Sequence, residues 1–299
     1  MFTRQDRLSP TGPIPSQKGH AVPRLISCLL VVTLLCGGNS LRADKPFPAH
    51  RIADNLYYVG SDALAVYLIT TPQGHLLINS GFPETVPLIE ASVTALGFKI
   101  TDVKIILASH AHADHVAGHA RLQQRTGAEV FVMRGDHTVI AAGGQGQYLY
   151  VDTRWPPCPV DRVLADGDDI TLGGITVTAH LTPGHTRGCT TWACQTTDAG
   201  QEYNVVIIGS PNVNPGYQLV KNTSYPQIAS DFAHTFTVLK KLPCDLFLGA
   251  HGAYYGMHEK YQQRDAIKGN PFFDPDGYAT YVASKEKAYR TELARQQPE

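Results

Sequence analysis

The sequence predicts an α/β protein built as an αββα sandwich, in which two mixed sheets pack face to face with helices outside. One observation behind this prediction is that short β-rich segments alternate with helical ones, an order that the second half of the chain repeats. Another is that hydrophobic residues make up 43% of the sequence, enough to fill a sizeable core between two sheets. No linker separates the halves, so we expect residues 44–299 to form a single domain.

The predicted elements follow from local patterns. β-branched and aromatic runs favour strands, whereas apolar residues at helical spacing favour helices. In the first half, strands are expected at 56–60, 65–69, 75–79, 103–108 and 130–132, with helices at 83–97 and from about His115 to Arg125. After a loop-like stretch at 141–157, strands are expected at 160–165, 169–172, 175–181, 190–196, 203–208 and 245–249, with a helix at 225–241 and helical segments to the end.

The charge balance excludes one class of partner. The 25 Lys and Arg residues are matched by 26 Asp and Glu, which leaves a formal net charge of −1. A protein that binds nucleic acid needs a basic face for the phosphates, and this sequence has no basic excess. We therefore expect no nucleic-acid partner. As a separate expectation, which the charge does not decide, we take the protein to be a monomer that acts on a small molecule.

The first residues resemble a targeting segment. Lys18 and Arg24 precede the apolar run Leu25–Cys36, and small and polar residues follow up to Ala43. This order is typical of a secretory signal peptide, so we expect residues 1–43 to be removed on export to the periplasm. The run is shorter than the roughly 20 residues that span a bilayer, so no permanent membrane anchor is expected.

Four cysteines follow the predicted signal peptide, and an oxidising compartment permits them to form disulfides. Cys189 and Cys194 lie five positions apart, about 16 Å on a straight strand, so they pair only if the chain turns back between them. We expect a disulfide but leave its pairing open.

A dense polar cluster follows the predicted buried strand 103–108. His110, His112, Asp114 and His115 lie within six residues of one another in the run Ser-His-Ala-His-Ala-Asp-His. Such polarity at the end of an apolar strand is costly unless something satisfies it, and a metal ion does so. His110 and His112, two apart in extended chain, project to the same side. The cluster therefore predicts a metal site.

Two further histidines follow other predicted strands. His185 comes after the strand 175–181, and His251 comes after the strand 245–249. Each alone is more typical of an ordinary loop, but zinc takes three or four nitrogen, oxygen or sulfur ligands. Together with the cluster, both become candidate ligands.

These motifs resemble the metallo-β-lactamase superfamily over residues 52–270, and within it the subclass B3 enzymes. The resemblance rests on the His-x-His-x-Asp-His run, on the segment Leu181–Trp192 with its Pro-Gly-His-Thr, and on Ser210 followed by Asn214–Tyr217. It implies the metallo-β-lactamase fold and a zinc hydrolase that confers antibiotic resistance. Such an enzyme opens the ring of penicillins, cephalosporins and carbapenems with a zinc-bound hydroxide.

The resemblance also implies roles for individual residues. One zinc ion would be held by three histidines and a second by the remaining three side chains, in the sets His110, His112, His185 and Asp114, His115, His251. Asp114 would also position the hydroxide. Cys244 resembles a cysteine that many relatives pair with one near the C-terminal helix, but no Cys follows it here, so it would be either free and buried or joined to Cys158. Ser210 and Asn212 are candidates for binding the substrate carboxylate, although a purely structural turn is an equally good interpretation.

Other functions remain open. Thioester hydrolases and lactonases on the same scaffold usually add a metal-bridging Asp on the strand before the 225–241 helix, and the stretch 205–210 contains no acidic residue. A zinc scavenger without turnover would be expected to carry His-rich or acidic tracts, which the sequence lacks.

Two regions near the motifs are interpreted as peripheral. The stretch 143–150, with Tyr148, Tyr150 and the nearby Trp155, fits an ordinary surface loop slightly better than a mobile wall over the substrate. Asp136 follows the strand 130–132 and lies outside the motifs. We expect its replacement by Asn to leave both metals and the rate nearly intact.

The signal-like segment yields the first testable prediction. Because residues 1–43 are expected to be cleaved on export, the mature protein should begin near Asp44. Mass spectrometry of the periplasmic fraction measures this start directly, and an intact chain starting at Met1 would refute it.

Overall fold

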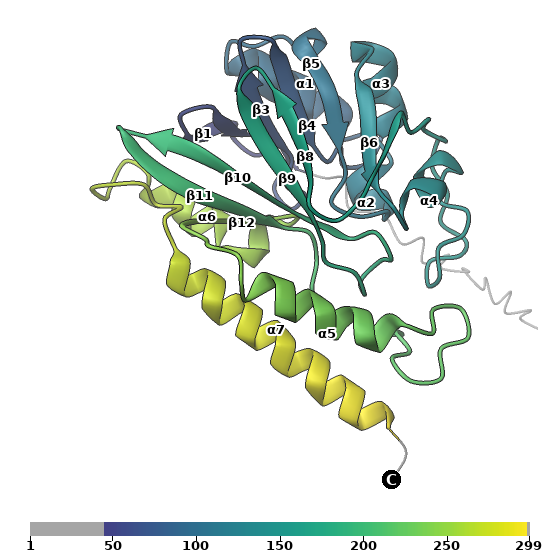
Figure 1. Ribbon diagram of the computed structural model, residues 1–299. Coiled ribbons are helices and arrows are strands. Elements are labelled where there is room, and N and C mark those ends of the chain that lie inside the picture. Colours follow the sequence, from purple (N-terminus) through teal and green to yellow (C-terminus); the bar gives the residue numbers. More distant parts are fainter. Residues whose placement is uncertain (1–44, 298–299) are drawn as a thin grey trace, which may run out of the picture. The chain divides into compact units, whose positions relative to one another are not determined.

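Two β-sheets form the framework of the structure, a computed structural model that describes residues 45–297. Figure 1 shows the sheets with helices on their outer sides. The αββα sandwich is therefore confirmed. The predicted signal peptide, residues 1–43, lies outside the described residues. Among the residues described, no helix is both long and apolar enough to cross a membrane.

The first sheet has seven strands in chain order and the second has five in the order β12-β11-β10-β9-β8. Each sheet mixes parallel and antiparallel pairs. The first sheet consists of β1 His50–Ala53, β2 Leu56–Tyr58, β3 Tyr67–Thr71, β4 Gly74–Ile78, β5 Val103–Leu107, β6 Glu129–Met133 and β7 Arg162–Leu164. The second consists of β8 Asp168–Leu172, β9 Ile175–Leu181, β10 Thr190–Asp198, β11 Gln201–Ile208 and β12 Leu246–Gly249.

The helices lie mainly at the outer faces. They are α1 Val86–Ala95, α2 Ala113–Val116, α3 His119–Thr126, α4 His137–Ala141, α5 Ile228–Leu239, α6 Met257–Gln263 and α7 Pro275–Gln296, with short 3-10 turns at Ile100–Asp102 and Gly252–Tyr254. Sequence analysis missed β1 and α4.

The helix expected from His115 to Arg125 is two helices, α2 and α3. The Ser80 amide donates to the His115 carbonyl, and the Gly118 amide donates to the Gly81 carbonyl, so the neighbouring loop takes up backbone groups at the break. A contact distant in sequence therefore decides where the helix ends.

Strand alternation divides the core between two layers. Leu76 and Ile78 of β4 join a cluster that includes Trp192 of the second sheet, whereas Leu77 joins a cluster that includes Val93 of α1. Successive side chains of a strand point to opposite faces, so the first sheet is buried on both sides.

Helices α5 and α7 run side by side next to the second sheet (Figure 1). Phe232 and Tyr289 stack with ring centroids 5.6 Å apart, and the Tyr289 hydroxyl donates to the Ala229 carbonyl.

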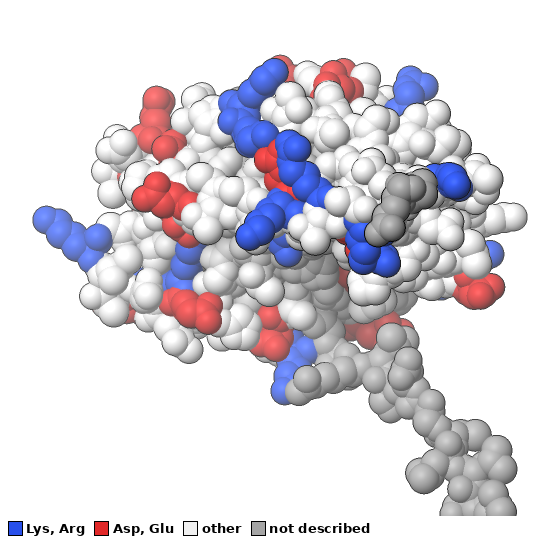
Figure 2. Space-filling model, turned by 90° about the horizontal axis from the view of Figure 1, so that it is seen from below, with Lys and Arg blue, Asp and Glu red and all other residues white. Residues whose placement is uncertain are grey.

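The face seen in Figure 2 carries acidic and basic side chains intermingled. On this helix pair Glu286 bridges Lys240 and Arg290.

The expectation of a disulfide is wrong for the described residues, because all four cysteines there are free. Cys158 belongs to the cluster under the helices of the first sheet, whereas Cys244 packs against the larger cluster. Cys189 directly precedes β10 and Cys194 lies within it, so the chain between them does not turn back.

A buried histidine on β1 predicts acid sensitivity. The His50 ring, 3% exposed, stacks against Tyr58 and Phe272, and burial lowers its pKa from 6.5 to about 4. Unfolded His50 takes up a proton below about pH 6.5 while the folded form stays neutral. Its contribution to stability is therefore complete above that pH and is lost as the pH falls towards 4.

The variant His50→Phe keeps an aromatic ring but removes the titration. Between pH 7 and pH 4 the unmodified protein should lose about 3 kcal/mol more of its free energy of unfolding than the variant. Urea unfolding in excess chelator at both pH values measures this without a contribution from metal. Equal losses in the two proteins would contradict the buried neutral state.

Candidate metal centre

The candidate ligands all follow the ends of strands. His110 and His112 come after β5, His185 comes after β9 and His251 comes after β12. Asp114 and His115 lie in the first turn of α2. Segments from both sheets therefore meet in one place.

The structure brings the six side chains together. Three of them, His110, His112 and His185, place ligand atoms within 4.8 Å of one another, as do His110, Asp114 and His115. His251 completes the group, because its Nε2 lies 3.1 Å from Nε2 of His115 and 3.6 Å from Oδ2 of Asp114. The two expected ligand sets, one of three histidines and the other of Asp114, His115 and His251, thus lie side by side. His110 of the first set lies next to the second.

The environment keeps four of these imidazoles neutral. Burial and the neighbouring histidines hold the pKa values of His110 and His112 well below the usual range, and they lower the pKa values of His185 and His251 to about 4. Burial raises the pKa of Asp114, but His115, His251 and His112 outweigh it and hold the pKa well below its usual value. Neutral imidazoles beside a carboxylate are the form that binds metal.

The donor set fits a transition metal. Nδ1 of His110 and Nδ1 of His115 are buried without a hydrogen-bond partner among the described residues. Closely packed nitrogen donors with a single carboxylate suit zinc better than calcium or magnesium, which prefer oxygen. The residues present therefore fit zinc, and the role of each as a ligand stays a prediction.

Backbone and side-chain groups orient the ligands. Nδ1 of His185 donates to the Asn212 carbonyl over 2.8 Å, which leaves Nε2 for metal. The backbone of Asn79 is in the left-handed region, at φ 70°. Its side-chain Oδ1 accepts a hydrogen bond from the Ser109 amide, and its Nδ2 donates one to the Ala65 carbonyl. These contacts fix the segment before His110 and the ring of His185.

The two expected substrate-binding residues converge on a tyrosine that sequence analysis did not single out. The Tyr254 hydroxyl accepts from Nδ2 of Asn212 over 2.8 Å and lies 3.2 Å from Oγ of Ser210. Its ring centroid lies 5.1 Å from that of His251. Ser210 is buried and Asn212 is half-buried, so their contact with substrate stays a prediction.

The 143–157 loop is more than an ordinary surface loop. The Tyr150 ring, 38% exposed, lies 4.9 Å from the His112 ring, and its hydroxyl accepts from Nδ2 of Asn214. Trp155 is buried away from solvent, and Tyr148 packs on Tyr217. Of the aromatic residues in this loop, Tyr150 is therefore the one at the rim.

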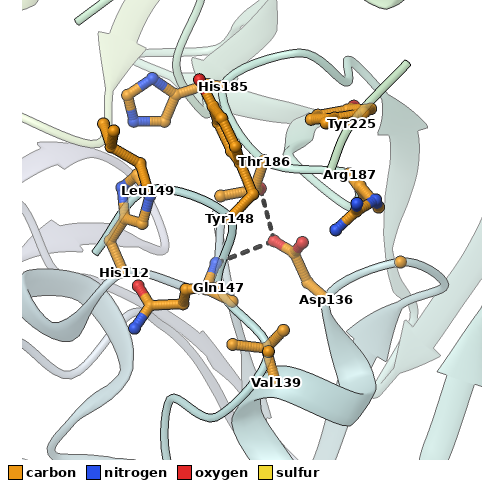
Figure 3. Close-up of a pocket in the computed structure, with 13 residues that line it drawn as sticks. His112, Asp136, Val139, Gln147, Tyr148, Leu149, His185, Thr186, Arg187 and Tyr225 are labelled. Carbon is orange, nitrogen blue, oxygen red and sulfur yellow. Dashed lines mark hydrogen bonds between the residues drawn. The ribbon is translucent and has the colours of Figure 1, made fainter. Parts of the chain in front are cut away.

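Asp136 is not peripheral, contrary to the expectation from sequence. It is buried and accepts hydrogen bonds from the Ala111 amide and from the Thr186 hydroxyl, next to the candidate ligands (Figure 3). Nothing local in the sequence indicates this, because the partners are 25 and 50 residues away.

Solved structures similar to this chain are metallo-β-lactamases. The native FEZ-1 metallo-β-lactamase of Legionella gormanii is 49% identical, with 85% of this chain and 98% of that one covered at a TM-score of 0.83. BJP-1, a subclass B3 metallo-β-lactamase of Bradyrhizobium japonicum, is 36% identical, with 86% and 97% covered at a TM-score of 0.80. The class B3 di-zinc enzyme LRA-12 from an Alaskan soil metagenome is 36% identical, with 83% and 94% covered at 0.79.

Curated relatives match a shorter part. A hydroxyacylglutathione hydrolase of Rhizobium etli is 34% identical over 134 residues, 42% of this chain and 44% of the relative. A probable metallo-hydrolase of Burkholderia pseudomallei is 32% identical over 131 residues, 42% of this chain and 43% of the relative. The match thus spans less than half the length of these relatives.

The model of the metallo-β-lactamase superfamily matches residues 62–197, which include five of the six candidate ligands. The solved structures extend the likeness to nearly their whole length, 98% and 97% of the FEZ-1 and BJP-1 chains. The chain therefore belongs to the metallo-β-lactamase superfamily and is similar to its subclass B3 members.

Proposed function

We propose that the protein is a zinc-dependent hydrolase that opens the ring of β-lactams, including penicillins, cephalosporins and carbapenems, and so confers antibiotic resistance. The observation that carries this is the near-complete likeness to metallo-β-lactamases, at 49% identity over 98% of the FEZ-1 chain. The six converging side chains support a two-ion site, and one similar structure is described as di-zinc.

When bound, zinc polarises a carbonyl oxygen and lowers the pKa of water towards about 7. Asp114 is the single carboxylate among the six candidate ligands, so the protein neutralises only one unit of the metal charge. A positive site of this kind favours an anionic substrate, as β-lactams with a ring carboxylate are. Asp114, beside His115 and His251, is placed to orient an attacking water.

The protein groups around the site argue against a covalent intermediate. The Cys189 thiol is fully buried and its pKa is raised by burial, so it is a poor nucleophile. The Ser210 hydroxyl contacts Tyr254 rather than a histidine that would serve as its base. We therefore assign Ser210 and Asn212 to substrate binding, and Tyr150 to the rim.

A thioester hydrolase is the second candidate, because hydroxyacylglutathione hydrolases are among the curated matches. Those matches cover 42% of this chain, and no acidic side chain follows β11 in the stretch 209–213. The bridging carboxylate expected of that class is therefore missing. We also propose that the protein is exported to the periplasm, on the basis of its signal-like first residues.

Turnover measured on several substrates separates the two candidates. Purified protein should hydrolyse a penicillin and a carbapenem faster than an acyl-lactone or an S-acylglutathione. Enzymes that act on lactones and thioesters usually have a metal-bridging carboxylate, and this site lacks it. A chelator should abolish the activity, and added zinc should restore it. Thioester turnover without any β-lactam turnover would favour the second candidate, and activity that resists a chelator would contradict both.

Replacing Asp114 by Asn tests the second metal position. The change keeps the shape but removes one negative charge, so about one zinc per chain should be lost while the three-histidine set keeps its metal. We expect kcat to fall by about two orders of magnitude, the scale of lost transition-state stabilisation. Zinc content and carbapenem turnover measure the two effects.

The matched control is Asp102→Asn, which alters an exposed carboxylate just before β5. It should leave zinc content and rate unchanged. An Asp114→Asn protein with full zinc and full rate would show that the second position is wrongly assigned.

A further inference from the structure

We propose that Asp136 is a positioning residue that locks together the two loops carrying His110, His112 and His185. The inference rests on the proposed metal-binding function of these histidines. It assigns a role to a side chain that is not itself among the candidate ligands.

The contacts of Asp136 reach both loops. Oδ2 accepts from the Ala111 amide over 2.8 Å and from the Thr186 hydroxyl over 2.6 Å, while Oδ1 accepts from the Gly188 amide over 2.8 Å. Ala111 lies between His110 and His112, and Thr186 directly follows His185. One carboxylate, 2% exposed, thus holds the Ala111 backbone between His110 and His112, and it holds the loop after His185 through the Thr186 hydroxyl and the Gly188 amide.

The alternative that Asp136 merely caps its own helix does not fit. It precedes α4, yet its side chain makes no capping hydrogen bond there. The surrounding glycines also show that the loops are built around it. A Cβ on Gly188 would lie 2.5 Å from the Asp136 amide nitrogen, and a Cβ on Gly135 would lie 2.7 Å from the backbone of Arg187.

The chemistry of the three partners requires a carboxylate. All three are donors and they engage both oxygens, so an amide in place of the carboxylate would turn its NH₂ group towards a donor. Asparagine therefore keeps the volume of Asp136 but loses at least one bond and adds an unfavourable contact. Burial raises the pKa of the Asp136 carboxyl, while the three hydrogen bonds and the nearby Arg187 act in the opposite direction. The Arg187 guanidinium lies over the Tyr225 ring.

The expected consequence is on metal affinity. Groups that orient metal ligands without binding metal typically change affinity 10- to 100-fold when removed. Asp136→Asn should therefore weaken zinc binding at the three-histidine set by about 10- to 100-fold. Thr186→Val, which removes one of the three bonds, should weaken it less, and Thr186→Ser, which keeps the hydroxyl, should retain the affinity.

The experiment is a zinc competition titration of metal-stripped protein against a chromophoric chelator, with the melting temperature of each metal-free protein measured alongside. The control Asp161→Asn changes an exposed carboxylate that also accepts a backbone hydrogen bond, from Val130, and whose side-chain donor is Gln123 rather than a residue beside the candidate ligands. Its zinc affinity should match that of the unmodified protein.

The outcomes separate a positioning role from a purely structural one. A lower melting temperature with unchanged zinc affinity in Asp136→Asn would overturn the proposal. If that variant fails to fold, equal affinities of Thr186→Val and Thr186→Ser would overturn it instead. Failure of the unmodified protein to bind zinc would refute the proposed function, a result distinct from equal binding by all variants.

Discussion

The crowding of five imidazoles and one carboxylate into a largely buried space is the constraint on which the rest of the structure depends. Neighbouring ring centroids lie 4.1–4.8 Å apart, and His110 is 1% exposed. Burial lowers the pKa values of His110 and His185, and the repulsion between protonated histidines at this spacing lowers them further. Neutral rings with nitrogen lone pairs turned towards a common centre are stabilised by a cation, and zinc matches their chemistry.

The scaffold meets this constraint with buried polar side chains that bind backbone groups. The Asn79 side chain holds the start of the His110 loop, and the Asp136 side chain joins that loop to the one with His185. The backbone carbonyl of Asn212 orients the His185 ring. Each lies at the end of a strand or close to it, where backbone groups are released from the sheet. Buried polar groups are tolerated when they are satisfied, and here the satisfied groups are those that place the ligands.

Sequence analysis predicted most strands and the ligand cluster because both depend on local patterns. Alternation in β4 and the run from His110 to His115 are visible without knowledge of the fold. Contacts that join distant segments were not predictable in this way. The break between α2 and α3 depends on Ser80 and Gly81, and the roles of Asp136 and Tyr254 depend on partners 25 or more residues away. The disulfide expectation failed because Cys158 and Cys244 belong to separate clusters.

Anomalous diffraction on either side of the zinc absorption edge tests the central claim most directly. In crystals of the zinc-loaded protein, the account predicts two anomalous peaks, one among His110, His112 and His185 and the other among Asp114, His115 and His251. Their separation should be a few ångströms, because the two ligand groups already touch. No peak at these side chains, or zinc bound only at other histidines such as His50 or His258, would contradict the account.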